Sequence, residues 1–199
     1  EIGIYKYFYL VSNGEDNKVY GDDDTYFGEG KGGEPGTVKP YEVNVYKSDY
    51  KTPDWMKNGI MYQIFPDRFF NGDTSNDYAQ TIGRGTTKYT FPTDWYSMPD
   101  SPVADKDTSD GEWSNDLFGG DLKGIEKKLD YLQSLGVSIV YINPINASIS
   151  NHRYDISDYE AVDAILGNLD DFTSLIKAAS KRDMKIILDG VFNHVSDDS

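Results

Sequence analysis

A short apolar run that stops at an aspartate constrains this chain more than any other stretch. Residues 185–188 read Lys-Ile-Ile-Leu, and residues 189–194 continue as Asp-Gly-Val-Phe-Asn-His. Continuous apolar runs of this length are typical of strands buried on both faces of a parallel sheet. In α/β folds the polar residues just past such strands carry the chemistry. Asp189, Asn193 and His194 are therefore candidate site residues, and this stretch alone leaves a solvated turn equally open.

The same pattern occurs twice upstream. Apolar runs at 60–65 and 137–142 are each followed by a long polar loop, which we expect to reach about residues 121 and 163. Apolar residues recur at helical spacing between the runs. One predicted helix contains Ile125, Leu129, Leu132 and Leu135 and stops at Gly136; the other follows the N-cap Asn168 and contains Phe172, Leu175, Ile176 and Ala179. Right-handed crossovers would make the three strands parallel, which predicts the first three β/α units of a (β/α)8 barrel.

The first part of the chain has a different pattern. Residues 3–12, 18–20 and 41–46 are rich in aromatic and branched residues, and Asn13-Gly14 predicts a hairpin. Residues 21–39 hold many Gly and Asp and are predicted to be a loop. These strands are too few to close a sandwich. We therefore expect residues 1–52 to be the C-terminal part of a β-sandwich domain and residues 53–199 to be the first part of the barrel.

Composition limits the kinds of partner. The net charge of −15 disfavours a nucleic-acid backbone or an anionic membrane, and the 16 tyrosines offer flat amphipathic rings that suit sugars. The chain has no cysteine, which excludes disulfides and thiolate chemistry. No apolar run approaches the roughly 20 residues that span a bilayer. Without an initiating Met or a signal-peptide pattern, the chain is expected to be a mature product or a fragment.

Four motifs now carry a resemblance. Residues 189–194 resemble the first signature region of the α-amylase family of glycoside hydrolases. Residues 62–69, 118–125 and 150–155 are similar to motifs of its neopullulanase and amylopullulanase branch, and the resemblance covers about residues 50–199. It implies a retaining, endo-acting hydrolase of α-1,4 bonds, with α-1,6 bonds left open, in starch, pullulan or maltodextrin. It also implies a secreted or cell-surface enzyme, with the cytoplasm as the alternative.

The resemblance places no catalytic residue in this chain. Retaining glycosidases use a carboxylate nucleophile and a carboxylic acid about 5–5.5 Å apart. In the family these groups follow the fourth and fifth barrel strands, and a third carboxylate follows the seventh. The chain alone is therefore expected to be inactive, and the remainder of the barrel is an expected partner.

Substrate contacts do carry over. Tyr154 matches the family's tyrosine that stacks on the sugar before the scissile bond, and His194 matches a histidine that binds a hydroxyl of that sugar. Asp189 is implied to hold neighbouring polar side chains, and His152 to line the same site. Without the resemblance, each histidine would be read as a surface residue.

A polar loop at residues 71–77 is the candidate metal site. Its Asp and Asn side chains supply the oxygen ligands that Ca²⁺ prefers, although the spacing alone is as well explained by turns. The resemblance implies a calcium site with six ligands, which are Asn71, Asp73, Asn76, Asp77, Gly119 and Asp121. Asn193 is left out of this set. The stretch 78–116 contains Trp95, Tyr96 and Trp113. Their spacing is consistent both with contact to the substrate and with a segment that simply covers the strand ends.

Two other functions remain open at this point. An α-glucan transglycosylase or branching enzyme would share the fold and the sugar site. A non-catalytic α-amylase-like protein that only binds glucan belongs to another class, and Tyr154 and His194 argue against it because such a protein need not keep them.

Overall fold

The computed structural model describes residues 1–25, 28–77, 79, 89–99 and 112–197. They belong to two compact units, Glu1–Asp54 and Trp55–Ser199. Among the described residues, no helix is long and apolar enough to cross a membrane.

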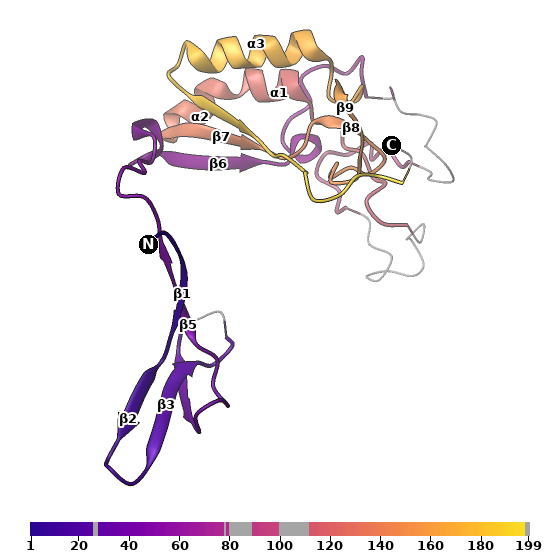
Figure 1. Cartoon of the computed structure of the whole chain (residues 1–199). Coiled ribbons are helices and arrows are strands. Elements are labelled where there is room, and N and C mark those ends of the chain that lie inside the picture. The colour runs from indigo at the N-terminus through magenta and orange to yellow at the C-terminus, as the bar shows by residue number, and fades with distance from the viewer. Residues whose placement is uncertain (26–27, 78, 80–88, 100–111, 198–199) are drawn as a thin grey trace. The chain divides into compact units, whose positions relative to one another are not determined.

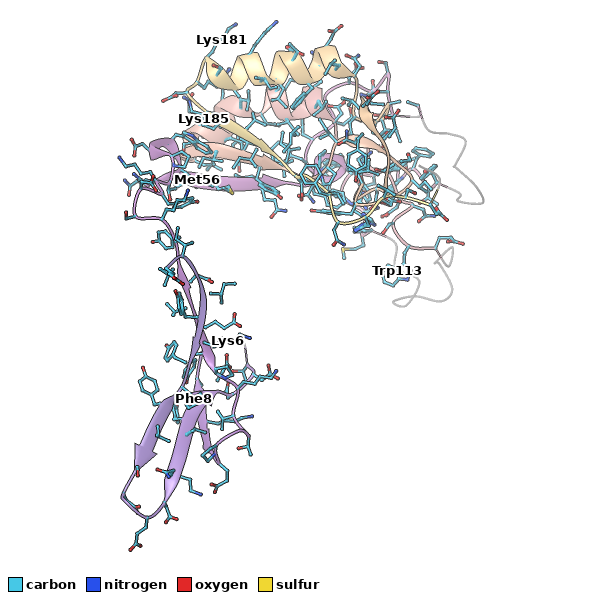
Figure 2. The ribbon with its side chains drawn as sticks, viewed as in Figure 1. Lys6, Phe8, Met56, Trp113, Lys181 and Lys185 are labelled. Atoms are coloured by element: carbon cyan, nitrogen blue, oxygen red, sulfur yellow. The ribbon has the colours of Figure 1, made fainter. Side chains whose placement is uncertain are left out.

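The first unit consists of two small antiparallel sheets. Strand β1 (Gly3–Tyr7) pairs with β5 (Tyr41–Val45), and β3 (Asn17–Asp22) lies between β2 (Tyr9–Ser12) and β4 (Gly30–Gly33) (Figure 1). The predicted hairpin is the β2–β3 pair. The apolar run 3–12 is divided at Phe8, which Figure 2 labels between Lys6 of β1 and the hairpin, so its two halves join different sheets.

Residues 21–39 were predicted to be a loop, but residues 30–33 within them form strand β4. Its glycines hide the strand pattern in the sequence, since glycine is normally depleted in strands. A Cβ on Gly30 would lie 2.0 Å from the hydroxyl oxygen of Tyr41 and 2.5 Å from the ring of Tyr20. Glycine is needed there because the two tyrosine rings occupy the space of a side chain.

Aromatic side chains of the first unit stay on its surface. The rings of Tyr7, Tyr9 and Tyr41 contact one another with centroids 5.5–6.5 Å apart. Among the described residues of this unit, Val19 alone is a buried apolar side chain. One layer of a sandwich would present such a surface to a second layer. The assignment of residues 1–52 to a β-sandwich therefore stays a proposal.

The second unit is built on a three-stranded parallel sheet in the order β10-β7-β6. The strands are β6 (Ile60–Ile64), β7 (Val137–Ile142) and β10 (Lys185–Leu188), and all three were predicted from their apolar runs. The helices of this unit lie on one side of the sheet (Figure 1). The helices connect β6 to β7 and β7 to β10, as the predicted β/α pattern requires.

Local signals place the helices. Helix α3 (Leu169–Ser180) begins with a capping box, in which the Asn168 side chain accepts backbone N–H bonds and the Asp171 side chain accepts the N–H of Asn168. The helix predicted around residues 125–135 is two shorter ones, α1 (Leu122–Lys127) and α2 (Leu129–Ser134). Lys128 separates them because its backbone leaves the helical region, with φ −99° and ψ 3°.

The core fills the space between the sheet and the helices. Its buried side chains come from β6, β7 and all three helices, and include Ile64, Leu122, Ile125, Leu129, Leu132, Val140, Ile142 and Leu175. The segment up to residue 163 was predicted to be a loop, but it contains an antiparallel hairpin of β8 (Asn146–Ser148) and β9 (Ile156–Val162). The hairpin lacks a clear alternation because β8 is three residues long and its pairing is irregular. Two short 3₁₀ turns, Asp54–Met56 and Pro66–Arg68, flank β6.

Candidate substrate site and metal loop

The C-terminal ends of the three parallel strands form one edge. The backbone N–H of Asn143 donates to the carbonyl of Ile64 at 3.0 Å, and that of Asp189 donates to Ile142 at 2.9 Å. Sheet pairing thus continues one residue past the strands. The amide of Gln63 also donates to Asn143 Oδ1 at 2.8 Å. This pairing brings polar residues of three distant segments to the same edge.

Tyr154 and Asp189 meet at that edge. The Tyr154 hydroxyl donates to Asp189 Oδ2 at 2.7 Å, and the hydroxyl of Tyr141 on β7 also bonds to Asp189. Burial, followed by the bond to Asp189, raises the pKa of Tyr154 to about 12. Tyr154 is therefore a neutral phenol whose ring is oriented by the carboxylate. Asp189 thus contacts two tyrosine hydroxyls, and its expected role in positioning the side chains of a sugar site stays a prediction.

His152 supports the backbone of Tyr154. Its Nδ1 accepts the backbone N–H of Tyr154 at 3.0 Å, and its ring centroid lies 5.8 Å from that of Tyr154. Because Nδ1 accepts, the proton of the neutral ring belongs on Nε2. Burial lowers the pKa of His152, outweighing the opposite effect of Asp155. Nε2–H is thus the group that His152 can offer to a ligand.

His194 holds the other side of the Tyr154 backbone. Its Nε2 lies 2.9 Å from the Tyr154 carbonyl, which can only accept, and its Nδ1 lies 3.3 Å from the Asn193 amide nitrogen. Both ring nitrogens are therefore engaged. To bind a sugar hydroxyl, His194 would have to exchange one of these partners. The expected sugar contact of His194 remains a prediction.

The four expected substrate residues thus form one cluster, since Tyr154 contacts Asp189, His152 and His194. Tyr141, whose hydroxyl is the second on Asp189, was not predicted from the sequence. Its signal was a hydroxyl-bearing ring within a buried apolar run, since a buried tyrosine hydroxyl usually finds a hydrogen-bond partner.

The turn before Tyr154 has an unusual backbone. Arg153 has a left-handed φ of 62° although it is not glycine, and its side chain is buried. Its N–H donates to Ser150 Oγ at 3.1 Å, and its Nη1 donates to the Asn151 carbonyl at 2.6 Å. These bonds offset the strain and turn the chain so that Tyr154 faces Asp189.

Asp121 organises the candidate metal loop. Its Oδ2 accepts the backbone N–H of Asp73 at 2.8 Å and the amide of Asn76 at 3.3 Å. The same carboxylate caps helix α1 by accepting from Gly124 N–H, and burial raises its pKa. Asp73 turns its Oδ1 to the Ser75 backbone and hydroxyl, at 2.9 and 2.6 Å.

Gly119 closes the other side of the loop. It has a φ of +80°, and a Cβ there would lie 2.7 Å from Asn71 Nδ2 and 2.8 Å from Asp77 Oδ1. The Asn71 amide donates to Asp77 Oδ1 at 2.6 Å. The six expected ligands are thus joined in two contacting groups, Asn71–Asp77–Gly119 and Asp73–Asn76–Asp121.

Two buried oxygens in this loop lack partners. Asn71 Oδ1 and Asn76 Oδ1 are both buried and accept no hydrogen bond. Buried acceptors are normally satisfied, so an unpaired pair beside two carboxylates suits a hard cation. Within the described residues, no three His, Cys, Asp or Glu side chains are close enough to hold a metal by themselves. Amide and backbone oxygens would have to supply part of the coordination, and the residues present fit Ca²⁺ on that condition.

Comparison with known proteins identifies the group to which these features belong. The model of the α-amylase catalytic domain matches residues 63–199. The chain belongs to the α-amylase family.

Similar proteins match nearly the whole length of this chain. It is 52% identical over 198 residues to an amylopullulanase of Thermoanaerobacter thermohydrosulfuricus, covering 97% of this chain and 13% of that protein. Neopullulanase 2 of Thermoactinomyces vulgaris is 37% identical over 196 residues, covering 96% and 28%. The type III pullulan hydrolase of Thermococcus kodakarensis superposes with a TM-score of 0.63 at 32% identity, covering 97% and 31%. The chain therefore spans a small part of the length of the relatives it matches.

One residue of this α-amylase-family chain links the strand edge to the candidate metal loop. Asp67 follows β6, is fully buried, and accepts the N–H groups of Phe118 and Gly119 at 2.9 and 3.2 Å. Burial raises its pKa against the opposing charge of Arg68, its ion-pair partner. Asp67 belongs to the motif at residues 62–69, but no role was predicted for it from the sequence. Its hydrogen bonds hold the Gly119 backbone next to Asn71 and Asp77.

Proposed function

We propose that this chain supplies the sugar-binding edge and a calcium loop of a retaining, endo-acting α-glucan hydrolase. The hydrolase would cleave α-1,4 bonds, with α-1,6 bonds as a second specificity, in starch, pullulan or maltodextrin. The observation that carries the proposal is Tyr154, held by Asp189, His152 and His194 at the C-terminal edge of parallel strands. Family membership and the amylopullulanase relative support the substrate class.

The cluster would bind and orient one sugar ring. The neutral Tyr154 ring covers the apolar face of a pyranose, and Asp189 and Tyr141 fix the angle of that ring. His152 offers Nε2–H to a hydroxyl while its Nδ1 keeps the backbone in place. A ring held in this way lowers the entropic cost of bringing the scissile bond to a catalytic pair.

The catalytic pair itself would come from elsewhere. Retaining hydrolysis needs a nucleophile and an acid at a fixed separation of about 5–5.5 Å. Asp189 accepts hydrogen bonds from the hydroxyls of Tyr154 and Tyr141, and Asp155 accepts the Ser150 backbone N–H at 3.1 Å. Both carboxylates therefore have a structural role instead of a catalytic one. The small share of its relatives that the chain spans supports a longer protein whose remaining barrel supplies the pair. We propose that residues 1–199 alone do not hydrolyse glucans.

Calcium would have a structural role here. The six oxygen-bearing residues Asn71, Asp73, Asn76, Asp77, Gly119 and Asp121 would hold it, and the unpaired oxygens of the two asparagines support this set. Its charge would offset the gathered carboxylates and fix the loop that follows β6.

For location we propose secretion or the cell surface, because polymers such as starch and pullulan are too large to cross a membrane. The alternative is a cytoplasmic enzyme acting on maltodextrins. Fractionation of the producing cells, with activity measured in medium and lysate, distinguishes the two.

The test of function compares the chain with the longer protein. Both are incubated with maltodextrin and with pullulan, and new reducing ends and the anomeric form of the product are measured. We expect retained anomers from the longer protein and no turnover from the chain. Turnover by the purified chain would assign catalysis to Asp155 or Asp189 and overturn the division proposed here. An inactive longer protein that still binds maltodextrin would favour a glucan-binding role.

A further inference from the structure

An aromatic cleft lies apart from the Tyr154 cluster. Its volume is about 460 Å³, within the range of ligand pockets. The lining shares no residue with the Tyr154 cluster. It adjoins the candidate metal loop through Asn71, and its other residues are Phe69, Phe70, Trp95, Tyr96, Lys128 and Tyr131. It is formed where the Trp95–Tyr96 turn lies against helix α2 and the segment after β6. Residues far apart in the sequence thus create one recess lined by flat rings.

The Trp95–Tyr96 turn is held in shape by its own hydrogen bonds. Asp94 Oδ1 accepts the Tyr96 N–H at 2.9 Å, and the Asp94 carbonyl accepts the Ser97 N–H at 3.1 Å. The Trp95 ring packs edge-on against Phe118, with centroids 6.1 Å apart. The turn therefore holds Trp95 against Phe118 and leaves Tyr96 91% exposed.

The rest of the lining combines aromatic rings with a charged group. Lys128 Nζ lies 4.0 Å from the centroid of the Phe70 ring. Tyr131 on α2 is 53% exposed and lines the same cleft. An apolar protein surface seated here would bury the ammonium group without a hydrogen-bond acceptor, at a free-energy cost. A ligand with both flat apolar faces and hydroxyl groups meets both kinds of lining.

We propose that this cleft is a second α-glucan-binding site, which holds a neutral maltooligosaccharide segment outside the Tyr154 cluster. Tyr96 and Tyr131 cover the faces of successive glucose rings, and Lys128 donates to their hydroxyls. The net charge of −15 favours a neutral ligand over an anionic one. The choice of glucan rests on the proposed function; the cleft and its rings do not.

Fluorescence of one tryptophan tests the site. Trp55 and Trp113 are 41% and 63% exposed, so Trp55→Phe/Trp113→Phe leaves Trp95 as the only tryptophan without disturbing the core. Figure 2 labels Trp113 on the second unit. Titration of this variant of the whole chain with maltoheptaose should give a saturable change in Trp95 emission. Adding Tyr96→Ala or Tyr131→Ala should weaken the apparent Kd by roughly fivefold or more, by analogy with base stacking on aromatic rings.

Matched variants separate this site from the proposed substrate site. Tyr131→Phe keeps the ring and should retain binding, and Tyr46→Ala, which removes a 69% exposed ring in the first unit, should change nothing. Tyr154→Ala should leave the Trp95 response intact while it removes one of two maltoheptaose sites in calorimetry. Absence of a saturable Trp95 response, or unchanged affinity in folded Tyr96→Ala and Tyr131→Ala, overturns the second site. A Tyr154→Ala variant with unchanged calorimetric binding instead counts against the proposed function alone.

Discussion

Arg153 and Asp163 form a fully buried ion pair. Arg153 Nε lies 3.1 Å from Asp163 Oδ2, and the side chains are 1% and 0% exposed. Arg153 belongs to the turn that presents Tyr154, whereas Asp163 follows β9 and bonds to the Ile145 carbonyl through its N–H at 2.9 Å. The pair therefore ties the Tyr154 turn to the base of the β8–β9 hairpin. Arg153 Nη2 has no partner, so the charge is incompletely satisfied.

Removing one member of this pair should be costly. Arg153→Met leaves the Asp163 carboxylate buried and uncompensated, which costs about 3–5 kcal/mol of unfolding free energy. The double variant Arg153→Met/Asp163→Leu should recover much of this loss, because it removes both charges. Urea unfolding followed by circular dichroism measures both. If the single variant loses less than about 1 kcal/mol, the pair does not hold the turn in the way inferred here.

Chelation should lower the melting temperature if calcium occupies the 71–77 loop. A ligand that binds only the folded state stabilises it by about 2.7 kcal/mol at a hundredfold excess over Kd. Asp73→Ala should remove most of the difference in Tm between EGTA and calcium. Asp23→Ala is a matched control, since Asp23 bonds to Thr25 in the first unit as Asp73 bonds to Ser75. An Asp73→Ala variant that keeps the full calcium response contradicts the assignment.

Tyr154→Ala should reduce kcat/KM of the longer protein on maltodextrin by at least about tenfold, with little loss of stability, because a stacking ring is removed from a half-buried position. Tyr154→Phe keeps the ring and loses only the bond to Asp189, so it should retain more activity. Initial rates and thermal unfolding separate the two effects. A variant that mainly unfolds would show that Tyr154 belongs to the core.

His152 should titrate below its ordinary value of about 6.5, because burial disfavours its charged form. The unfolded chain takes up this proton near pH 6.5, and the folded chain does so only at lower pH. The stability from the neutral ring is therefore present above about pH 6.5 and is lost as the pH falls through the folded pKa. The chain has two histidines, so NMR of their ring protons, assigned with His152→Gln, follows this group directly. A His152 midpoint above 6.5 would contradict the burial argument.

Much of the second unit could be predicted from local sequence. The runs at Ile60–Ile64, Val137–Ile142 and Lys185–Leu188 became its three parallel strands, because buried strands need continuous apolar side chains. The N-cap at Asn168 likewise fixed the start of α3, since capping depends on neighbours three residues apart. The local pattern also indicated Asp189 and His194, because they follow the end of a buried apolar run. The resemblance supplied their expected roles and added Tyr154 and His152.

Only the tertiary structure decided which side chains meet. Tyr154 reaches Asp189 across 35 residues, and its ring angle depends on the left-handed backbone of Arg153 and on the irregular β8–β9 hairpin. None of these has a period or a turn signature in the sequence. The Asn76 amide likewise meets Asp121 across 45 residues of sequence, and the unpaired oxygens of Asn71 and Asn76 are visible only in the folded loop. Local propensity acts over a few residues, whereas a site forms from contacts made after long loops have closed.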